Sequence, residues 1–157
     1  MDNQTAIKIE KSFTLFSDQL LGLGATYSSI LIFNDNNLVI KSFSSDQEWA
    51  DEFTSKELYK DCHLLQEAHK QMKLNQAAFT IAWDLYSPVT EKAKNLDDVR
   101  KQKNITHGVG FCIQYAGHPK ILLNIAGKYA DVNFGLNVLR NRGKIYQELR
   151  EILMKNV

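Results

Sequence analysis

The fold is decided by two short runs of sequence, Val109-Gly110-Phe111-Cys112-Ile113 and Ile121-Leu122-Leu123-Asn124-Ile125. Both runs consist mainly of β-branched and large apolar residues, which favour extended strands. Gly117-His118-Pro119 lies between them and supplies turn-forming residues. The sequence therefore predicts a β-hairpin in this region.

A second, weaker hairpin is predicted earlier in the chain. Residues 26–33 and 38–43 are rich in β-branched and aromatic side chains, and Asn34-Asp35-Asn36-Asn37 separates them. A further short apolar stretch covers residues 79–83, and Ser87-Pro88 marks a break after it.

Amphipathic helices are predicted around the hairpins because apolar residues recur there at helical spacing. They cover residues 3–23, the region from 49 to 72, residues 91–103 and residues 131–155. Ser44, Ser45 or Asp46 can cap the second helix, and the third is polar enough to be a solvated surface helix. The last helix is expected to be interrupted or weakened near Gly143. This order predicts an α+β fold, an antiparallel sheet sandwiched between helices in a GAF- or PAS-like αβα arrangement.

Length and composition indicate one domain over residues 1–157. The chain has 157 residues, a formal net charge of +1 and two cysteines. Such a small charge gives no overall field that would attract nucleic acid or an anionic membrane, so we expect neither as a direct partner. The beginning of the chain lacks the pattern of a signal peptide, and two cysteines are too few for a disulfide scaffold, so a cytoplasmic protein is expected.

Catalytic and metal-binding motifs are not recognisable. Cys112 lies in an apolar strand pattern, where a free cysteine is usually a core residue. His63 and His69 are six residues apart and fall on different faces of a helix, so they do not predict a metal site. Gly108-Val109-Gly110 precedes a strand, whereas a dinucleotide-binding glycine motif opens a helix. We therefore expect a protein that is not an enzyme, with no metal and no cofactor.

Aromatic residues gather in the middle of the chain. Trp49, Phe53, Tyr59 and Trp83 lie on segments expected to cover one face of the sheet, with Phe79 and Tyr86 close by in sequence. Two interpretations are open. These side chains can all belong to the core, or, with Asp61 nearby, they can line a pocket for a small amphipathic ligand, since indole and phenol groups need polar partners when buried.

At these residues the sequence resembles the autoinducer-binding domain of LuxR-type quorum-sensing transcriptional regulators. The segment Trp49-Ala-Asp-Glu-Phe53 followed by Tyr59-Lys60-Asp61 is similar to the family's Trp-x-x-x-Tyr, aromatic and Asp-Pro pattern. Phe79-Thr-Ile-Ala-Trp83 looks like the stretch that ends in its second tryptophan. Residues 104–126 resemble its glycine-led hairpin, and the likeness covers roughly residues 3–150.

The resemblance implies a site for an N-acyl-homoserine lactone. The indole N–H of Trp49 would hold the lactone carbonyl, and Asp61 would accept from the amide N–H. Trp83 and Phe79 would form part of an apolar wall, Gly108 would leave backbone room, and Asn124 falls where the family often has Ser or Thr. The site residues expected in this way are Trp49, Phe53, Tyr59, Asp61, Phe79, Trp83, Gly108 and Asn124.

Several residues depart from the family pattern. Phe53 replaces a tyrosine whose hydroxyl helps to bind the acyl carbonyl, and Cys62 stands where proline follows the aspartate. The interval from Trp49 to Asp61 is one residue short, and that from Asp61 to Trp83 is longer than usual. These changes predict altered ligand selectivity, because a missing donor changes which polar groups are satisfied.

The end of the sequence also departs from the family, whose members continue into a helix-turn-helix domain. The last predicted helix has a basic face and an apolar face, which is typical of a packing or dimerisation helix. The resemblance thus implies a small-molecule sensor domain without a DNA-binding domain, expected as a homodimer. The alternative is a ligand-independent interaction module that dimerises or regulates a partner through its last helix.

Overall fold

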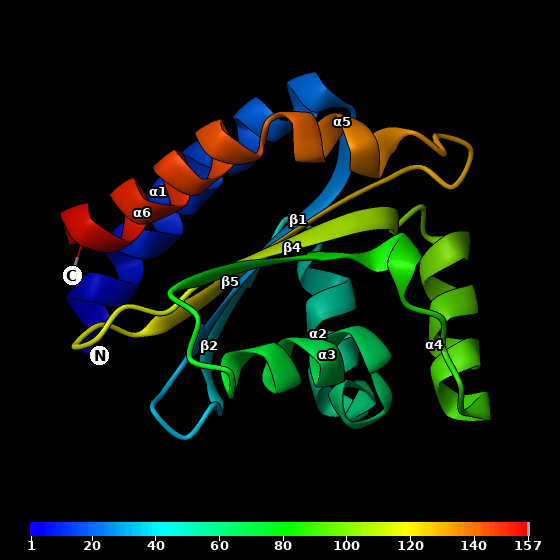
Figure 1. Ribbon diagram of the computed structural model, residues 1–157, viewed down its shortest axis with the longest axis horizontal. Helices are drawn as coiled ribbons and strands as arrows, with labels where there is room; N and C mark the ends of the chain where they lie inside the picture. Colours follow the sequence, from blue (N-terminus) through cyan, green and yellow to red (C-terminus); the bar gives the residue numbers. More distant parts are fainter. Residues whose placement is uncertain (157) are drawn as a thin grey trace.

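The computed structural model contains one antiparallel sheet. It describes residues 1–156, so Val157, the last residue of the predicted domain, lies outside the described residues. Within that range five strands follow the order β2-β1-β5-β4-β3 (Figure 1). Their bounds are β1 Ala25–Phe33, β2 Val39–Ser44, β3 Ala78–Ala82, β4 Thr106–Ile113 and β5 Lys120–Gly127.

Both predicted hairpins are confirmed. Strand β4 pairs with β5, with Phe111 opposite Leu123, and β1 pairs with β2, with Ile30 opposite Phe43. The two hairpins join because β5 also pairs with β1, which places Leu123 opposite Ile30. Strand β5 is therefore the centre of the sheet. The apolar stretch around residues 79–83 forms the remaining edge strand, β3, against β4.

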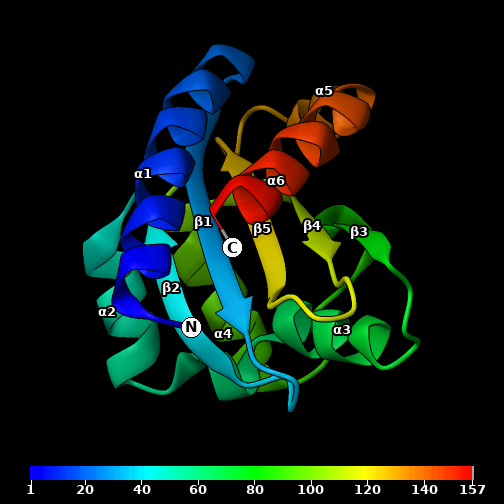
Figure 2. The same cartoon turned by 90° about the vertical axis from the view of Figure 1, so that its left-hand side faces the viewer.

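Helices cover both faces of the sheet, which confirms the predicted α+β sandwich. One layer contains α1, α5 and α6, and the other contains α2, α3 and α4 (Figure 1). Their bounds are α1 Asn3–Leu20, α2 Gln47–Ser55, α3 His63–Met72, α4 Glu91–Gln102, α5 Phe134–Arg140 and α6 Arg142–Asn156. Figure 2 shows α1 and α6 side by side, where Asn156 Nδ2 donates to Ser12 Oγ at 3.0 Å. Every helix within residues 1–156 is too short or too polar to cross a bilayer.

Alternation along the strands divides the core between the two faces. Leu123 and its cross-strand neighbours Ile30 and Phe111 are fully buried beneath α1, α5 and α6. Leu122 points the opposite way, into the cluster beneath α2, α3 and α4. Successive side chains point to opposite faces of a strand, so substitutions of Leu123 and Leu122 each affect the packing of one helical layer.

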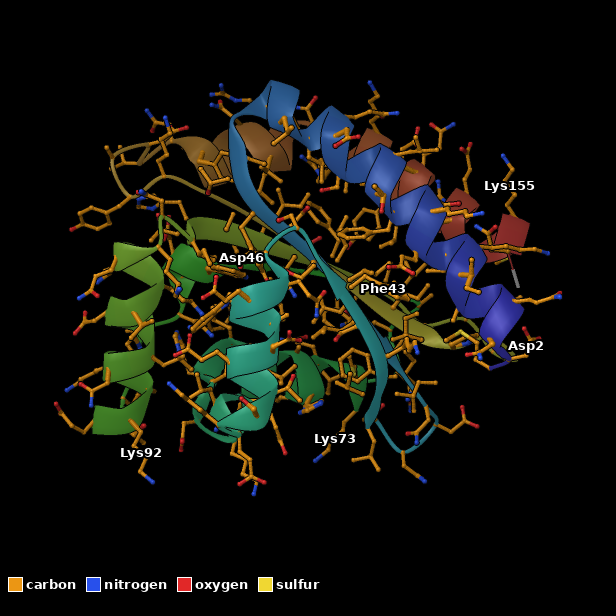
Figure 3. All side chains as sticks on the ribbon, turned by 180° about the vertical axis from the view of Figure 1, so that it is seen from behind. Asp2, Phe43, Asp46, Lys73, Lys92 and Lys155 are labelled. Carbon is orange, nitrogen blue, oxygen red and sulfur yellow. The ribbon has the colours of Figure 1, made fainter. Side chains whose placement is uncertain are left out.

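The helical region from 49 to 72 is broken, which the spacing of apolar residues did not predict. Helix α2 begins after Asp46, whose carboxylate accepts a hydrogen bond from the Trp49 backbone N–H at 2.9 Å. Asp46 lies at the end of α2 that is next to β2 (Figure 3). It ends at Ser55, and Glu57 then adopts a left-handed conformation with φ 53°. A short 3-10 helix, η2 Leu58–Asp61, leads into α3, so the chain turns sharply between the two helices.

The long C-terminal helix is also divided. The interruption predicted near Gly143 falls at Asn141, between α5 and α6, and Gly143 itself lies inside α6. Val132 and Leu136, which the apolar pattern placed on the buried face, are 66% and 56% exposed. Asn141 Nδ2 donates to the Asn137 carbonyl at 2.8 Å and satisfies one of the carbonyls left free at the end of α5.

Candidate functional site

A cavity of about 680 Å³ lies between the sheet and the α2–α3 layer. Its floor comes from the faces of β1 and β5 that carry Leu31 and Leu122, and its roof includes Leu64 and Leu65 of α3. It extends to the edge strand β2, where Ile40 is 43% exposed. Its size is within the usual range for pockets that enclose small molecules.

Both tryptophans of the chain line this cavity. Trp49 of α2 is 3% exposed, and its ring lies 5.9 Å from that of Phe53, one turn later. Trp83 begins the short 3-10 helix η3 Trp83–Leu85 directly after β3. The two tryptophans therefore lie in the wall of a cavity, and Trp49 also belongs to the buried cluster of this layer.

The structure brings five of the eight predicted site residues into the cavity wall and leaves three outside it. Those in the wall are Trp49, Phe53, Tyr59, Trp83 and Asn124. Asp61 ends η2 and lies outside the wall, Phe79 is buried in β3, and Gly108 is buried in β4. Neither the carboxylate expected to accept from a ligand amide nor the glycine expected to leave room for the ligand lines the cavity.

Gly108 leaves room for Trp83. A Cβ built at Gly108 would lie 2.5 Å from Cδ2 of the indole, so the ring packs directly on the glycine backbone. The close approach positions Trp83 at the end of β3, where its ring also meets the guanidinium carbon of Arg100 at 5.9 Å.

Gly108→Ala is therefore expected to displace Trp83. Since the added methyl group has no space, we expect a loss of about 1–3 kcal/mol in the free energy of unfolding. Chemical denaturation followed by circular dichroism measures it. Gly143→Ala is the control, because within residues 1–156 no atom outside its own helix backbone lies within 4 Å of a Cβ at that glycine. Equal stability of Gly108→Ala and the wild type would contradict the packing described for Trp83.

Arg100 of α4 is a wall residue that the sequence did not reveal. The helix is confirmed and mostly exposed, but Arg100 is 5% exposed and lines the cavity. Its Nη2 donates to Cys62 Sγ at 2.7 Å. The spacing along α4 indicates that Arg100 lies on the buried face of the helix, because it follows Leu96 by four residues and Ala93 by seven, and both of these residues are buried.

Other polar groups of the wall come from the sheet. Tyr27 and Ser29 of β1 lie near Ser44 of β2 and Asn124 of β5. Burial raises the pKa of Tyr27, and the hydroxyls of Ser29 and Ser44 oppose that rise. Asn124 Nδ2 donates to Ser29 Oγ at 3.4 Å. The arrangement gives a mainly apolar cavity with hydroxyl, amide and guanidinium groups at particular points, which suits an amphipathic molecule.

A second cavity of about 530 Å³ lies beside η3 and is polar. Within it, His107 Nδ1 lies 2.9 Å from Asp84 Oδ2, and His107 Nε2 lies 2.8 Å from the Tyr129 carbonyl. Both partners accept hydrogen bonds, so the imidazolium, with two N–H donors, satisfies them together. His107 has a left-handed φ of 51° within the irregular pairing of β4 with β5, which turns its ring toward η3.

We expect His107 to titrate above about 6.5, the usual histidine value. Burial alone would lower its pKa, but the Tyr129 carbonyl and Asp84 raise it overall. A raised pKa in the folded state gives stability that is present below the unfolded pKa and lost as pH rises through the folded value. NMR titration of the imidazole resonances measures it, and Asp84→Asn should lower the value. A His107 pKa below 6.5 in the wild type would contradict the pairing.

No protein-family model matches the chain, and no curated protein matches it by sequence. Solved structures do match, and they define the fold as that of the autoinducer-binding domains of LuxR-type regulators. The resemblance seen in the sequence is thereby confirmed for the fold. At 15% identity or less, these structures show the fold alone.

The similar structures include SdiA of Escherichia coli, with a TM-score of 0.64, 15% identity and coverage of 93% of this chain. The chain spans 59% of that SdiA chain. SdiA in complex with octanoyl-rac-glycerol matches at a TM-score of 0.55 and 13% identity, over 76% of this chain and 47% of that one. The N-acylhomoserine lactone dependent LuxR family transcription factor CepR2 of Burkholderia cenocepacia matches at 0.62 and 9% identity, over 97% of both chains.

Proposed function

We propose that the chain is a small-molecule sensor domain that encloses an amphipathic ligand in the 680 Å³ cavity between the sheet and the α2–α3 layer. The observation that carries the proposal is the position of both tryptophans in the wall of a mainly apolar cavity. Two proteins with this fold support it by their ligands, since one is dependent on an N-acylhomoserine lactone and another is complexed with octanoyl glycerol.

An acyl chain fits the apolar part of the wall. Leu31 and Leu122 of the sheet face Leu64 and Leu65 of α3 across the cavity. Filling this hollow removes apolar surface from water on both the ligand and the protein, which is the main source of binding free energy for such a ligand. The acyl chain would complete the core of this layer.

The polar end of the ligand would lie near Trp49, whose indole N–H is the proposed donor to a ligand carbonyl. Phe53 contributes only apolar surface there, and the donor that a tyrosine would supply is missing. Tyr27, Ser29 and Asn124 offer other donors and acceptors from the sheet. Ligand selectivity is therefore proposed to differ from that of the acyl-homoserine lactone receptors.

The domain would act by binding and without catalysis. A ligand that binds only the folded state adds RT ln(1 + [L]/Kd) to stability, about 2.7 kcal/mol at a hundred times Kd. The stabilised domain would then pass its response to a further domain or to a partner. CepR2, which shares this fold, is a LuxR family transcription factor, and this favours a signalling role over an enzymatic one.

Thermal unfolding in the presence of N-acyl-homoserine lactones of several chain lengths and octanoyl glycerol tests the proposal. We expect the melting temperature to rise with at least one of them. Homoserine lactone without an acyl chain is the control, because it lacks the apolar part that the cavity encloses. The absence of a shift with every lactone, at concentrations far above micromolar, would overturn the acyl-lactone version.

Homodimerisation stays a prediction. Exposed apolar side chains on α1, η1 Leu21–Leu23 and the α5 region include Leu15, Leu21 and Leu136, at 68%, 63% and 56% exposure. Burying such residues between two copies would favour a dimer. Size-exclusion chromatography with light scattering, with and without ligand, measures the mass directly. The ligand-independent interaction module predicted as the alternative would dimerise without responding to any ligand.

A further inference from the structure

Arg100 places a positive charge in the wall of the cavity without an anion to balance it. The side chain is 5% exposed, and its Nη1 nitrogen is buried with no hydrogen-bond partner among the described residues. Its Nη2 donates to Cys62 Sγ at 2.7 Å, a weak acceptor for so strong a donor. A guanidinium stays protonated at any pH at which the protein is folded, so burial cannot neutralise it.

The rest of the wall supplies no compensating charge. Among the described residues that line the cavity there is no Asp or Glu, whereas Lys41 and Arg100 are both cationic. The ion pairs within residues 1–156 involve other residues, and Lys101, next to Arg100 in α4, pairs with Asp97 at 3.4 Å. The ring of Trp83, 5.9 Å from the guanidinium carbon, offers only partial compensation through its π-electrons.

The charge of Arg100 reaches Tyr27 in the cavity wall and His63, which lines the second cavity. It lowers the pKa of His63 on α3 in addition to the lowering by burial, and it opposes the rise that burial gives the pKa of Tyr27 on β1. Arg100 itself lines the cavity beside Cys62 at the start of α3, where an occupant of the cavity would meet it. Buried cations are stabilised by a paired anion, and an Arg–carboxylate pair is one of the strongest such contacts.

We propose that the cavity selects an amphipathic acid, an acyl chain ending in a carboxylate, whose carboxylate pairs with Arg100 while its chain lies against Leu122 and the leucines of α3. The proposal rests on the proposed function and specifies its ligand class. A single carboxylate balances the single buried guanidinium, whereas a phosphate monoester would bring excess charge. A lactone or a glyceride would leave the guanidinium unbalanced.

The absence of an aspartate from the wall supports the same ligand class. Asp61, expected to accept from a ligand amide N–H, lies outside the cavity wall. A carboxylate in the wall would repel an acidic ligand and favour an amide donor. The wall contains groups that can donate hydrogen bonds to a carboxylate, namely the guanidinium of Arg100 and the hydroxyls of Tyr27 and Ser29.

Binding of decanoate, methyl decanoate and octanoyl glycerol, followed by tryptophan emission at pH 7, tests the proposal. The acid and its ester share one chain and differ by the charge, so their ratio of Kd values isolates the pairing with Arg100. Because a hydrogen bond to a charged partner is worth a factor of about 10 to 100, we expect decanoate to bind more tightly than its ester by that factor. Arg100→Met should bring the ratio to within about threefold.

Lys103→Met is the matched control. Lys103 follows Arg100 by one helical turn and lies 5.3 Å from the ring of Trp49, but it does not line the cavity. We expect its acid-to-ester ratio to equal that of the wild type. An equal effect of both methionine variants would overturn the assignment to Arg100 and indicate a general effect of positive charge.

The remaining outcomes separate this proposal from the proposed function. Equal or tighter binding of methyl decanoate or octanoyl glycerol than of decanoate by the wild type would overturn the acid preference while leaving the sensor function in place. No binding of any of the three probes would overturn the acid preference, and the absence of binding by the N-acyl-homoserine lactones as well would overturn both. If Arg100→Met fails to fold, the ratio of the Kd values of decanoate and methyl decanoate in the wild type still tests the acid preference. Arg100→Lys keeps the charge but loses the planar guanidinium, so it should then show a reduced preference for decanoate.

Discussion

Leu123→Ala is expected to lower the free energy of unfolding by about 3–5 kcal/mol, the upper part of the range for buried leucines. Leu123 is fully buried at the centre of β5, between Ile30 and Phe111 of the neighbouring strands and beneath α1, α5 and α6. Truncation there leaves a cavity that the rigid sheet cannot close. Urea denaturation measures the loss.

The adjacent substitution, Leu122→Ala, is the matched comparison. Leu122 is 3% exposed, but it lines the existing cavity on the other face of the same strand. It has fewer contacts to lose on that side, so we expect about 2 kcal/mol, the lower end of the range. Equal losses for the two variants would contradict the division into a filled face and a hollow face.

Gly110→Val is expected to weaken ligand binding while preserving the fold. Gly110 lies in the floor of the cavity, and the nearest atoms to a Cβ there are two side-chain ends, Asn124 Oδ1 at 3.1 Å and Leu122 Cδ1 at 3.3 Å, with Ile81 Cβ in ordinary contact at 3.8 Å. Both can shift slightly, and valine suits a strand. Because the added side chain occupies space that the ligand needs, we expect affinity to fall by a factor of at least about 10, or 1.4 kcal/mol.

Gly22→Val is the control for this prediction. Gly22 lies in η1, outside the cavity, with nothing within 4 Å of a Cβ. Its affinity for octanoyl glycerol or decanoate should match that of the wild type in an equilibrium titration. Undiminished binding by a folded Gly110→Val protein would show that the ligand binds elsewhere.

The sheet could be predicted from the sequence because its hairpins rest on local signals. The runs around Phe111 and Leu123 alternate between two buried faces, and Gly117-His118-Pro119 marks their turn. The pairing of β5 with β1, and of β3 with β4, depends on contacts between distant segments, so no local pattern could supply it. The break at Glu57 likewise depends on how η2 packs against α4, since propensity alone favours a continuous helix there.

The site was predictable only in part, for a physical reason. Aromatic residues such as Trp49 and Trp83 are conspicuous in the sequence, but whether they fill a core or line a hollow depends on the volume left between layers. Arg100 was missed because a charged residue on a polar helix is usually exposed. Gly108 was assigned to the ligand, whereas the space above it is occupied by Trp83.

The central claim, that the cavity encloses an amphipathic molecule, is tested most directly by intrinsic tryptophan fluorescence. The chain has two tryptophans and both line the cavity, so any occupant must change their surroundings. We predict a saturable change in emission on titration with at least one of decanoate, octanoyl glycerol and N-octanoyl-homoserine lactone, and a shift of that titration to at least about tenfold higher ligand concentration in Gly110→Val. Emission unchanged by all three up to their solubility limits would contradict the claim.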